Sequence, residues 1–269
     1  MGKKQAIPYT TVYNIYSLNR ILQIWLKEIK CAQKMSLFIL TGAGISAPSG
    51  LCTFRDDKDG FWKRYDSDIV SHARTRKTKE HYQFTNMYRK LVSECEPNAA
   101  HRWIANLQRK FGDKVQLYTT NVDDLHEMAG SKVIHLHGCV NSIRCDSCDY
   151  KTSVGLSYKL NNNDELCHKG CSLHGRMRND VVLFDEELPE SYSTLLKDLQ
   201  SSPENSIFLV IGTSLGIYSW DLVRIRGTKI FVNTDAEICK HFDPCFHEVI
   251  CGDISKKEVI ETVEKLLKL

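Results

Sequence analysis

Residues 37–44 read Leu37-Phe38-Ile39-Leu40-Thr41-Gly42-Ala43-Gly44. Four apolar residues in a row that run into a glycine pair predict a buried strand followed by a tight turn. At the end of a parallel strand, such a turn lets the backbone approach a phosphate group closely. The third glycine of the full dinucleotide-binding pattern is absent, so the turn alone does not establish a nucleotide site.

Short apolar runs of the same kind predict further buried strands. They lie at residues 115–119, 133–136, 181–184, 207–211 and 229–232. Apolar residues repeat at helical spacing over residues 14–34 and from Ser255 to the end of the chain, and helical patterns separate several of the strands. This alternation predicts an α/β fold with a doubly wound, Rossmann-like and mostly parallel sheet.

Two stretches interrupt the alternation and predict a smaller second lobe. Residues 56–110 look helical and charged, whereas residues 139–178 are rich in cysteine. A chain of 269 residues buries one full-sized core plus a small module, so we expect a single domain over residues 1–269. The large lobe would comprise residues 14–55, 111–138 and 179–269, and the small lobe the helical insertion 56–110 and a zinc-ribbon-like module 139–178.

The composition excludes several classes of partner. The 36 Lys and Arg nearly cancel the 33 Asp and Glu, so no strong field attracts nucleic acid or an anionic membrane. No apolar run approaches the roughly 18 residues that cross a bilayer, and the N-terminus lacks the apolar core of a signal peptide. We therefore expect no membrane partner and a cytoplasmic location, with nuclear residence as the alternative. The sequence leaves the oligomeric state open.

The cysteines predict a structural metal site. Without a secretion signal, eleven cysteines are interpreted as thiols and metal ligands in a reducing compartment. Cys145-x2-Cys148 and Cys167-x3-Cys171 supply two thiolate pairs at the spacing that grips one tetrahedral zinc ion. Four cysteines complete the zinc shell and leave no open position for a substrate, so we expect this zinc to hold the lobe together without taking part in chemistry.

Several motifs occur in order around these features. The glycine turn continues as Ile45-Ser46-Ala47-Pro48-Ser49-Gly50-Leu51-Cys52-Thr53-Phe54-Arg55, and later blocks are 119–126 (TTNVDDLH), 135–138 (HLHG), 181–186 (VVLFDE) and 212–214 (GTS). With these motifs, residues 35–255 resemble the sirtuin family of NAD-dependent lysine deacylases. The resemblance implies NAD as co-substrate, structural zinc and an acyl-lysine protein or peptide as substrate.

The resemblance also implies the residues that bind NAD. Phe54 would shield the reacting ribose carbon, Asp123 would grip the nicotinamide carboxamide, and Asn121 would order the ribose and a water molecule. Arg55 would steady the cofactor loop near phosphate, and Asn233 would contact the adenosine ribose. The full set implied is Gly42, Ala43, Gly44, Thr53, Phe54, Arg55, Thr120, Asn121, Asp123, His137, Gly212, Thr213, Ser214, Asn233 and Ile254.

The same resemblance gives His137, together with Asn121, a catalytic role. His137 would act as general base, accepting a proton from a ribose hydroxyl after the acyl oxygen has attacked the ribose carbon, and imidazole suits that task near neutral pH. The products would be nicotinamide, the free lysine and an O-acyl-ADP-ribose. Residues 181–184 resemble the edge where the substrate peptide adds as a strand, with Val182 and Phe184 lining the acyl-lysine channel. The neighbouring His101, His126 and His135 are interpreted as structural.

The sequence departs from the family pattern at four positions near this site. Thr120 replaces the usual Gln, Cys52 and Asn179 replace Pro, and Asp185 replaces a peptide-side Gly. Asp185 adds a charge and a Cβ atom where a backbone should pass. Members that prefer succinyl-lysine resemble one another in a Tyr-x-x-Arg pair, which aligns here with Thr85 and Tyr88, although Arg89 follows immediately. We therefore expect no dedicated pocket for acidic acyl groups.

Two other functions compete with deacylation. An NAD glycohydrolase or an ADP-ribosyltransferase on the same fold would agree with the changes at Thr120 and Asp185. It would release nicotinamide without an acylated peptide. A non-catalytic binding module would show no NAD turnover at all, although the presence of Asn121, Asp123 and His137 together argues against this reading.

Overall fold

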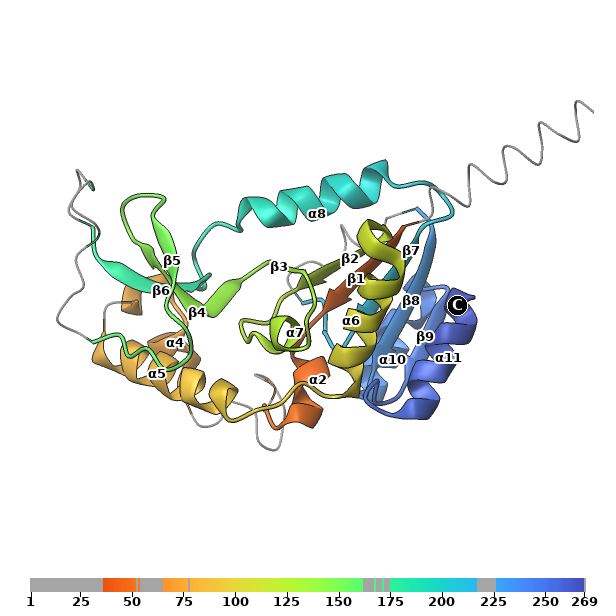
Figure 1. The fold of residues 1–269 in the computed structure, drawn as a ribbon, viewed down its shortest axis with the longest axis horizontal. Helices are drawn as coiled ribbons and strands as arrows, with labels where there is room; N and C mark the ends of the chain where they lie inside the picture. Colours follow the sequence, from red (N-terminus) through yellow and green to blue (C-terminus); the bar gives the residue numbers. More distant parts are fainter. Residues whose placement is uncertain are drawn as a thin grey trace, which may run out of the picture.

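The computed structural model describes residues 36–51, 53, 65–76, 78–161, 167, 171, 175–216 and 226–268. Among these residues the main sheet has six parallel strands in the order β3-β2-β1-β7-β8-β9, which confirms the doubly wound prediction (Figure 1). The strands are β1 (Leu37–Thr41), β2 (Val115–Thr119), β3 (Val133–His135), β7 (Ile207–Ile211), β8 (Thr228–Asn233) and β9 (Glu248–Cys251).

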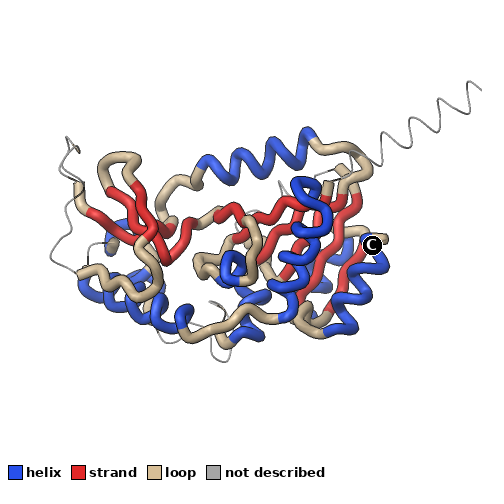
Figure 2. The backbone as a smooth tube through the Cα atoms, in the orientation of Figure 1, coloured by secondary structure: helices blue, strands red, loops and turns tan. Residues whose placement is uncertain are grey.

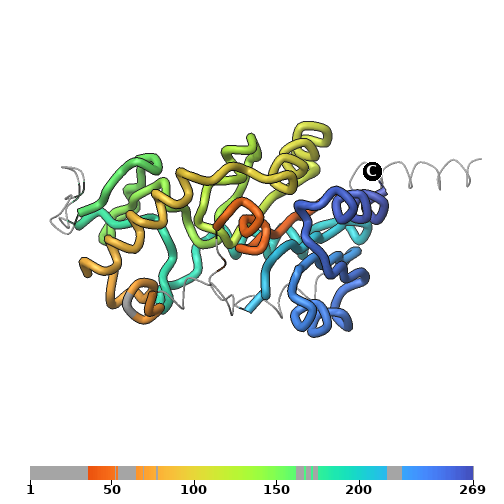
Figure 3. Tube along the Cα trace, turned by 90° about the horizontal axis from the view of Figure 1, so that it is seen from below, coloured from red at the N-terminus to blue at the C-terminus, as the bar shows by residue number. Residues whose placement is uncertain are grey.

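Helices cover both faces of this sheet because its central strands are apolar on both sides. Every residue of β1 and β7 is buried. On one face the core includes side chains of α6 (Ala99–Phe111) and α11 (Lys257–Leu267), and on the other side chains of α8 (Glu190–Ser201) and α10 (Ala236–Phe242). Figure 3 shows α6 and α11 on the side of the sheet opposite α10.

A second, smaller sheet lies beyond the β3 edge of the main sheet (Figure 2). Its described strands are antiparallel in the order β5-β4-β6, with β4 at Gly138–Cys145, β5 at Lys151–Ser153 and β6 at Met177–Val181. Helices α4 (Ser67–Val70) and α5 (Lys79–Ser93) pack beside it. The described residues also form the short helices α2 (Ala43–Ser46) and α7 (Leu125–Met128), and 3₁₀ turns at Ala47–Ser49, Ala73–Thr75, Gly112–Lys114 and Asp243–Cys245.

The structure corrects one predicted strand and adds two strands, β6 and β9, that the apolar pattern missed. Residues 181–184 do not form a buried strand of the main sheet, because β6 ends at Val181 and belongs to the small sheet. The apolar pattern missed β6 because Arg178, Asn179 and Asp180 are buried within it. Strand β9 was also missed, since its only two apolar aliphatic residues make too short a run. The helix expected over residues 14–34 lies outside the described residues, and none of the described helices is long and apolar enough to cross a membrane.

Candidate active site at the carboxyl ends of the central strands

The turns after β1 and β7 meet at the centre of the sheet. The strand order reverses between β1 and β7, which is where doubly wound sheets open a crevice for a ligand. The Gly44 N–H donates to the carbonyl of Gly212 at 2.8 Å. A Cβ atom on Gly44 would lie 2.8 Å from Gly212 Cα, and Gly212 itself has a φ of +63°. The two backbones therefore touch, and only glycine allows this contact.

A small pocket opens beside this contact, at the ends of β7, β8 and β9. The Asn233 side chain faces it and donates through Nδ2 to the Thr213 carbonyl at 3.1 Å. The pocket is lined by Gly44, Ile211, Gly212, Val232, Asn233, Thr234, Gly252, Asp253 and Ile254. Four residues that the sequence assigned to NAD, namely Gly44, Gly212, Asn233 and Ile254, thus lie around one pocket.

A buried polar cluster lies at the end of β2. The Ser46 hydroxyl donates to Asp123 Oδ2 at 3.0 Å and accepts from Asn121 Nδ2 at 3.1 Å. Asp123 Oδ1 also accepts from the Leu125 N–H at 3.2 Å. All three side chains of the cluster are buried, and burial raises the pKa of Asp123 to about 6. Ser46 therefore links the glycine turn to both Asn121 and Asp123.

His137 lies between the two sheets, immediately before β4. Its Nδ1 atom lies 2.9 Å from the carbonyl oxygen of Thr120, and a carbonyl can only accept, so Nδ1 carries the hydrogen. Burial lowers the pKa of His137, and the bond to Thr120 partly offsets this. The ring is therefore neutral at neutral pH, with its proton-accepting lone pair on Nε2.

The predicted peptide edge is anchored on both sides. The Val182 N–H donates to the His137 carbonyl at 2.9 Å, while Phe184 pairs in parallel with His72 through bonds to Ser71 and Ala73. Both backbone groups of Phe184 are thereby used within the chain. The next residue, Asp185, adopts a φ of +72°, the conformation that glycine takes most easily, and its carboxylate lies 2.7 Å from His72 Nδ1.

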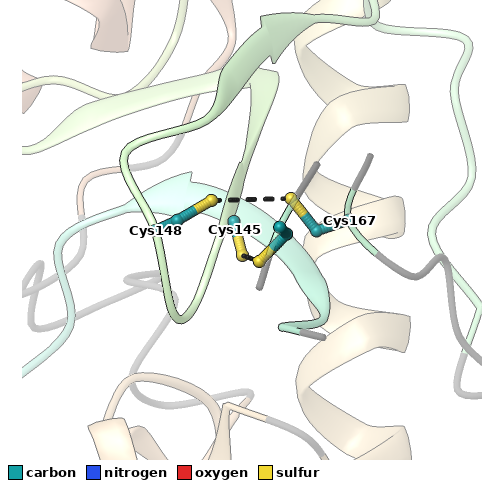
Figure 4. A group of neighbouring side chains, drawn as sticks. Cys145, Cys148 and Cys167 are labelled. Carbon is teal, nitrogen blue, oxygen red and sulfur yellow. Dashed lines mark hydrogen bonds between the residues drawn. The ribbon is translucent and has the colours of Figure 1, made fainter. Parts of the chain in front are cut away.

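Four sulfur atoms gather at the far end of β4. Cys145 Sγ lies 4.0 Å from Cys171 Sγ, and Cys148 Sγ lies 3.6 Å from Cys167 Sγ (Figure 4). All four lie within 4.8 Å of one another. Ligands at 2.3 Å from a tetrahedral zinc ion are about 3.8 Å apart, so the thiolates fit this metal. Gly175 belongs to the site, since a Cβ atom there would lie 2.4 Å from Cys145 Sγ.

Comparison with known proteins shows the family to which this fold belongs. The model of the Sir2 family matches residues 42–219. A protein of Campylobacter jejuni (strain RM1221) named NAD-dependent protein deacylase is 37% identical, covering 82% of this chain and 93% of that protein. The chain belongs to the Sir2 family.

Other Sir2 relatives agree with this assignment. A protein of Mycobacterium tuberculosis (strain H37Rv), also named NAD-dependent protein deacylase, is 36% identical and covers 73% of this chain and 84% of its own. Among solved structures, a mutant Sir2 homologue in complex with ADP-ribose superposes with a TM-score of 0.74 at 30% identity, covering 90% of this chain and 98% of its own. A Sir2 homologue in complex with NAD superposes with a TM-score of 0.72 at 29% identity, covering 88% of this chain and 92% of its own.

The other residues that the sequence assigned to the site are placed as follows. Thr120 lies beside His137, and Ala43, Thr53, Thr213 and Ser214 are partly buried near the turns. Phe54 and Arg55 lie outside the described residues, as does the departure at Cys52.

Two residues of this Sir2-type site were missed in the sequence. Ser46 was quoted in a motif without a role, although it bridges Asn121 and Asp123. Asn98 caps α6 by accepting from the Ala100 N–H, and its Nδ2 atom donates to the Ile45 carbonyl at 2.7 Å and to Ser49 Oγ at 2.9 Å. An Asn before a helix is a common cap. Its contacts with the segment after the glycine turn could not be foreseen from that pattern.

Replacing Asp123 by asparagine is expected to stabilise the free protein at pH 8. Because the folded pKa of about 6 exceeds the ordinary value of 3.8, the stability contributed by the protonated carboxyl is lost as the pH rises through 6. The free energy of unfolding of the variant should exceed that of the wild type by on the order of 2 kcal/mol at pH 8 and by little at pH 4. Thermal melting at both values measures this, with exposed Asp113→Asn as control. An equal shift at both pH values would contradict the prediction.

Proposed function

We propose that this Sir2-family chain is an NAD-dependent protein-lysine deacylase, with acetyl-lysine as its main substrate. The observation that carries the proposal is the convergence, at the ends of β1 and β2, of a buried Asn121–Ser46–Asp123 cluster and a neutral His137. Relatives named NAD-dependent protein deacylase cover most of the chain, which agrees with this activity. Each residue role below is part of the proposal.

The residues around the glycine turns would hold NAD. Gly42, Gly44 and Gly212 keep side chains away from the crevice, so backbone amides can approach the pyrophosphate, and Asn233 would contact the adenosine ribose. NAD supplies a ribose carbon whose bond to nicotinamide breaks as the acyl oxygen of the substrate attacks. Asp123 would accept from the carboxamide, and Ser46 and Leu125 keep its carboxylate oriented.

His137 would then remove a proton from a ribose hydroxyl. The Thr120 carbonyl fixes the Nδ1–H tautomer, so Nε2 is the basic atom, and the lowered pKa keeps the ring neutral at working pH. Replacement of Gln by Thr at position 120 leaves this function intact, because the carbonyl and not the side chain orients the ring. Val182 connects the base to the peptide edge through the His137 carbonyl.

The region expected to surround the acyl group supports a preference for neutral acyl chains. Tyr88 is buried and packs among apolar residues with Leu51, Val92 and Leu125. Arg89 is fully buried on another side of α5, where its Nε atom donates to the Val140 carbonyl and its guanidinium lies 5.6 Å from the ring centre of Tyr158. Since Thr85 and Tyr88 occupy the two Tyr-x-x-Arg positions and neither supplies the arginine of that pair, acetyl-lysine should react faster than succinyl-lysine.

Mass spectrometry of NAD reactions tests the proposal. The protein is incubated with NAD alone and with matched unmodified, acetyl-, longer-acyl- and succinyl-lysine peptides. Release of nicotinamide only with an acyl peptide, together with an O-acyl-ADP-ribose, is the expected result. Release without peptide would replace deacylation by NAD glycohydrolysis or ADP-ribosyl transfer, and no turnover would indicate a binding role. Faster succinyl- than acetyl-lysine removal would contradict the acyl preference alone.

The zinc site and the location of the protein complete the proposal. Cys145, Cys148, Cys167 and Cys171 would hold one zinc ion, which supplies no open position for chemistry and joins the turn after β4 to the segment before β6. The near balance of charge and the eleven cysteines of the chain favour a reducing compartment, the cytoplasm, with the nucleus as alternative. Metal analysis and imaging of a tagged chain would test these two points.

A further inference from the structure

Both ring nitrogens of His135 face groups that can only accept hydrogen bonds. His135 Nδ1 lies 2.8 Å from the carbonyl oxygen of Asn121, and His135 Nε2 lies 2.8 Å from Glu127 Oε1. A neutral imidazole has one N–H group and can satisfy only one of these contacts, whereas the imidazolium has two. The geometry therefore fits a protonated ring. The sequence had assigned His135 only a structural role.

The charges around His135 favour that protonated state. Glu127 of α7 and Asp123 of the preceding loop both raise the pKa of His135, and with the bond to Asn121 they outweigh the lowering caused by burial. Asp124 also interacts with it electrostatically, and the nearby His126 is neutral because burial holds its pKa well below the usual value. From α8 the Ser191 hydroxyl, a neutral group, donates to the His135 carbonyl at 3.0 Å.

Asn121 depends on this contact for its position. Its N–H donates to Thr119 Oγ1 at 3.0 Å and its side chain donates to Ser46 Oγ at 3.1 Å. The third anchor is its carbonyl oxygen, which His135 holds from the outer side of β3. Removing that anchor would free the peptide unit that joins Asn121 to Val122, and so loosen the residue that faces the ribose.

We propose that His135 and Glu127 form an imidazolium–carboxylate clamp that positions Asn121 for the reaction. This inference rests on the proposed function for its effect on turnover. His135 touches neither substrate in this proposal and acts through Asn121. Glu127 is half exposed, so the clamp lies at the border between the site and solvent.

Loss of one proton opens the clamp on the side of Asn121. As the pH rises through the raised pKa of His135, the proton that faces the neutral carbonyl leaves before the one that faces the carboxylate. The Nδ1 lone pair then opposes the Asn121 oxygen, and the anchor becomes a repulsion. Turnover should therefore fall at alkaline pH because of His135, while it falls at acid pH because His137 must be neutral.

Glu127→Gln tests this assignment by removing the charge without removing the side chain. Without the carboxylate the pKa of His135 drops, so the alkaline limb of kcat should move down by about one pH unit. The acid limb and the KM for the acetyl peptide should stay unchanged. Glu190→Gln, an exposed carboxylate beside Ser191, is the matched control for loss of charge and should move neither limb. An alkaline limb that stays in place in Glu127→Gln overturns the proposal.

Nitrogen NMR of labelled histidines gives a second readout that needs no turnover. The His135 signal, assigned by its loss in His135→Asn, should report two protonated ring nitrogens at pH 7 in the wild-type chain and titration at lower pH in Glu127→Gln. A neutral ring at pH 7 would overturn the clamp whatever the activity. If the protein turns out to have no deacylase activity, a protonated His135 still supports the clamp, and only the proposed function fails.

Discussion

Replacing His137 by alanine is expected to lower kcat/KM for deacylation by about 10²- to 10⁴-fold, the usual contribution of a general base. The neutral ring is held by Thr120, so the loss removes the proposed proton acceptor and leaves the pocket around Asn233, where NAD is proposed to bind, intact. Because the base acts after nicotinamide has left, exchange of labelled nicotinamide into NAD should survive in the presence of acetyl peptide. Measuring exchange and deacylation side by side separates the two steps.

A histidine outside the site provides the control for this variant. His241 is exposed on α10, and His241→Ala should retain wild-type rates. Melting temperatures of both variants show whether either loss comes from unfolding. Deacylation by His137→Ala within threefold of wild type would remove His137 from the reaction and leave the Sir2 assignment untouched.

Removal of the zinc ion is expected to abolish both the order of the small sheet and the activity. In small zinc modules the apparent free energy of binding structural zinc is about 10–16 kcal/mol, so the folded form depends on the metal. Strand β4 begins immediately after His137 and ends at Cys145, and β6 leads into Val182. Loss of the metal should therefore release the strand that follows the proposed base and the segment proposed to receive the peptide.

Cys171→Ser tests the zinc prediction without a chelator. The variant should bind less than one zinc ion per chain, lose amide protection in β4 and β6 by hydrogen exchange, and show no measurable deacylation. Protection in β1 and β7 should persist, since those strands belong to the core of the main sheet. Cys245→Ser removes a thiol far from the cluster and should behave as wild type. Full activity after loss of zinc would show that the metal is dispensable.

Most strands of the main sheet could be predicted because each is a local run of apolar residues. Ile207–Ile211 is apolar throughout, as a strand covered on both faces must be. The cysteine spacing likewise predicted the cluster around Cys145, since two short turns suffice to bring each pair together. The motifs at Asn121 and His137 predicted the site only through a family resemblance, because no periodicity points to a single histidine.

What the sequence did not predict depends on contacts between distant residues. The apolar pattern missed strand β6 because the strand contains charged residues. Arg178 can be buried there since it forms an ion pair with Glu186 at 2.6 Å, a partner that the local sequence pattern does not indicate. Ser46 gains its role only when β1 and β2 lie side by side and bring Asp123 Oδ2 within 3.0 Å of the Ser46 hydroxyl. The two bonds of His135 involve residues 8 and 14 positions away, so its protonation is a property of the fold.

The double duty of Asn98 has a consequence for how this enzyme can change during evolution. Asn98 Oδ1 caps the start of α6, and Asn98 Nδ2 donates to the Ile45 carbonyl in the segment that follows the glycine turn. A substitution of Asn98 would weaken the start of α6 and the attachment of the segment after the glycine turn at the same time. Folding stability and turnover would therefore change together at this position. Sequence variation that tunes the cofactor loop must therefore accumulate elsewhere, in residues whose side chains serve the loop alone.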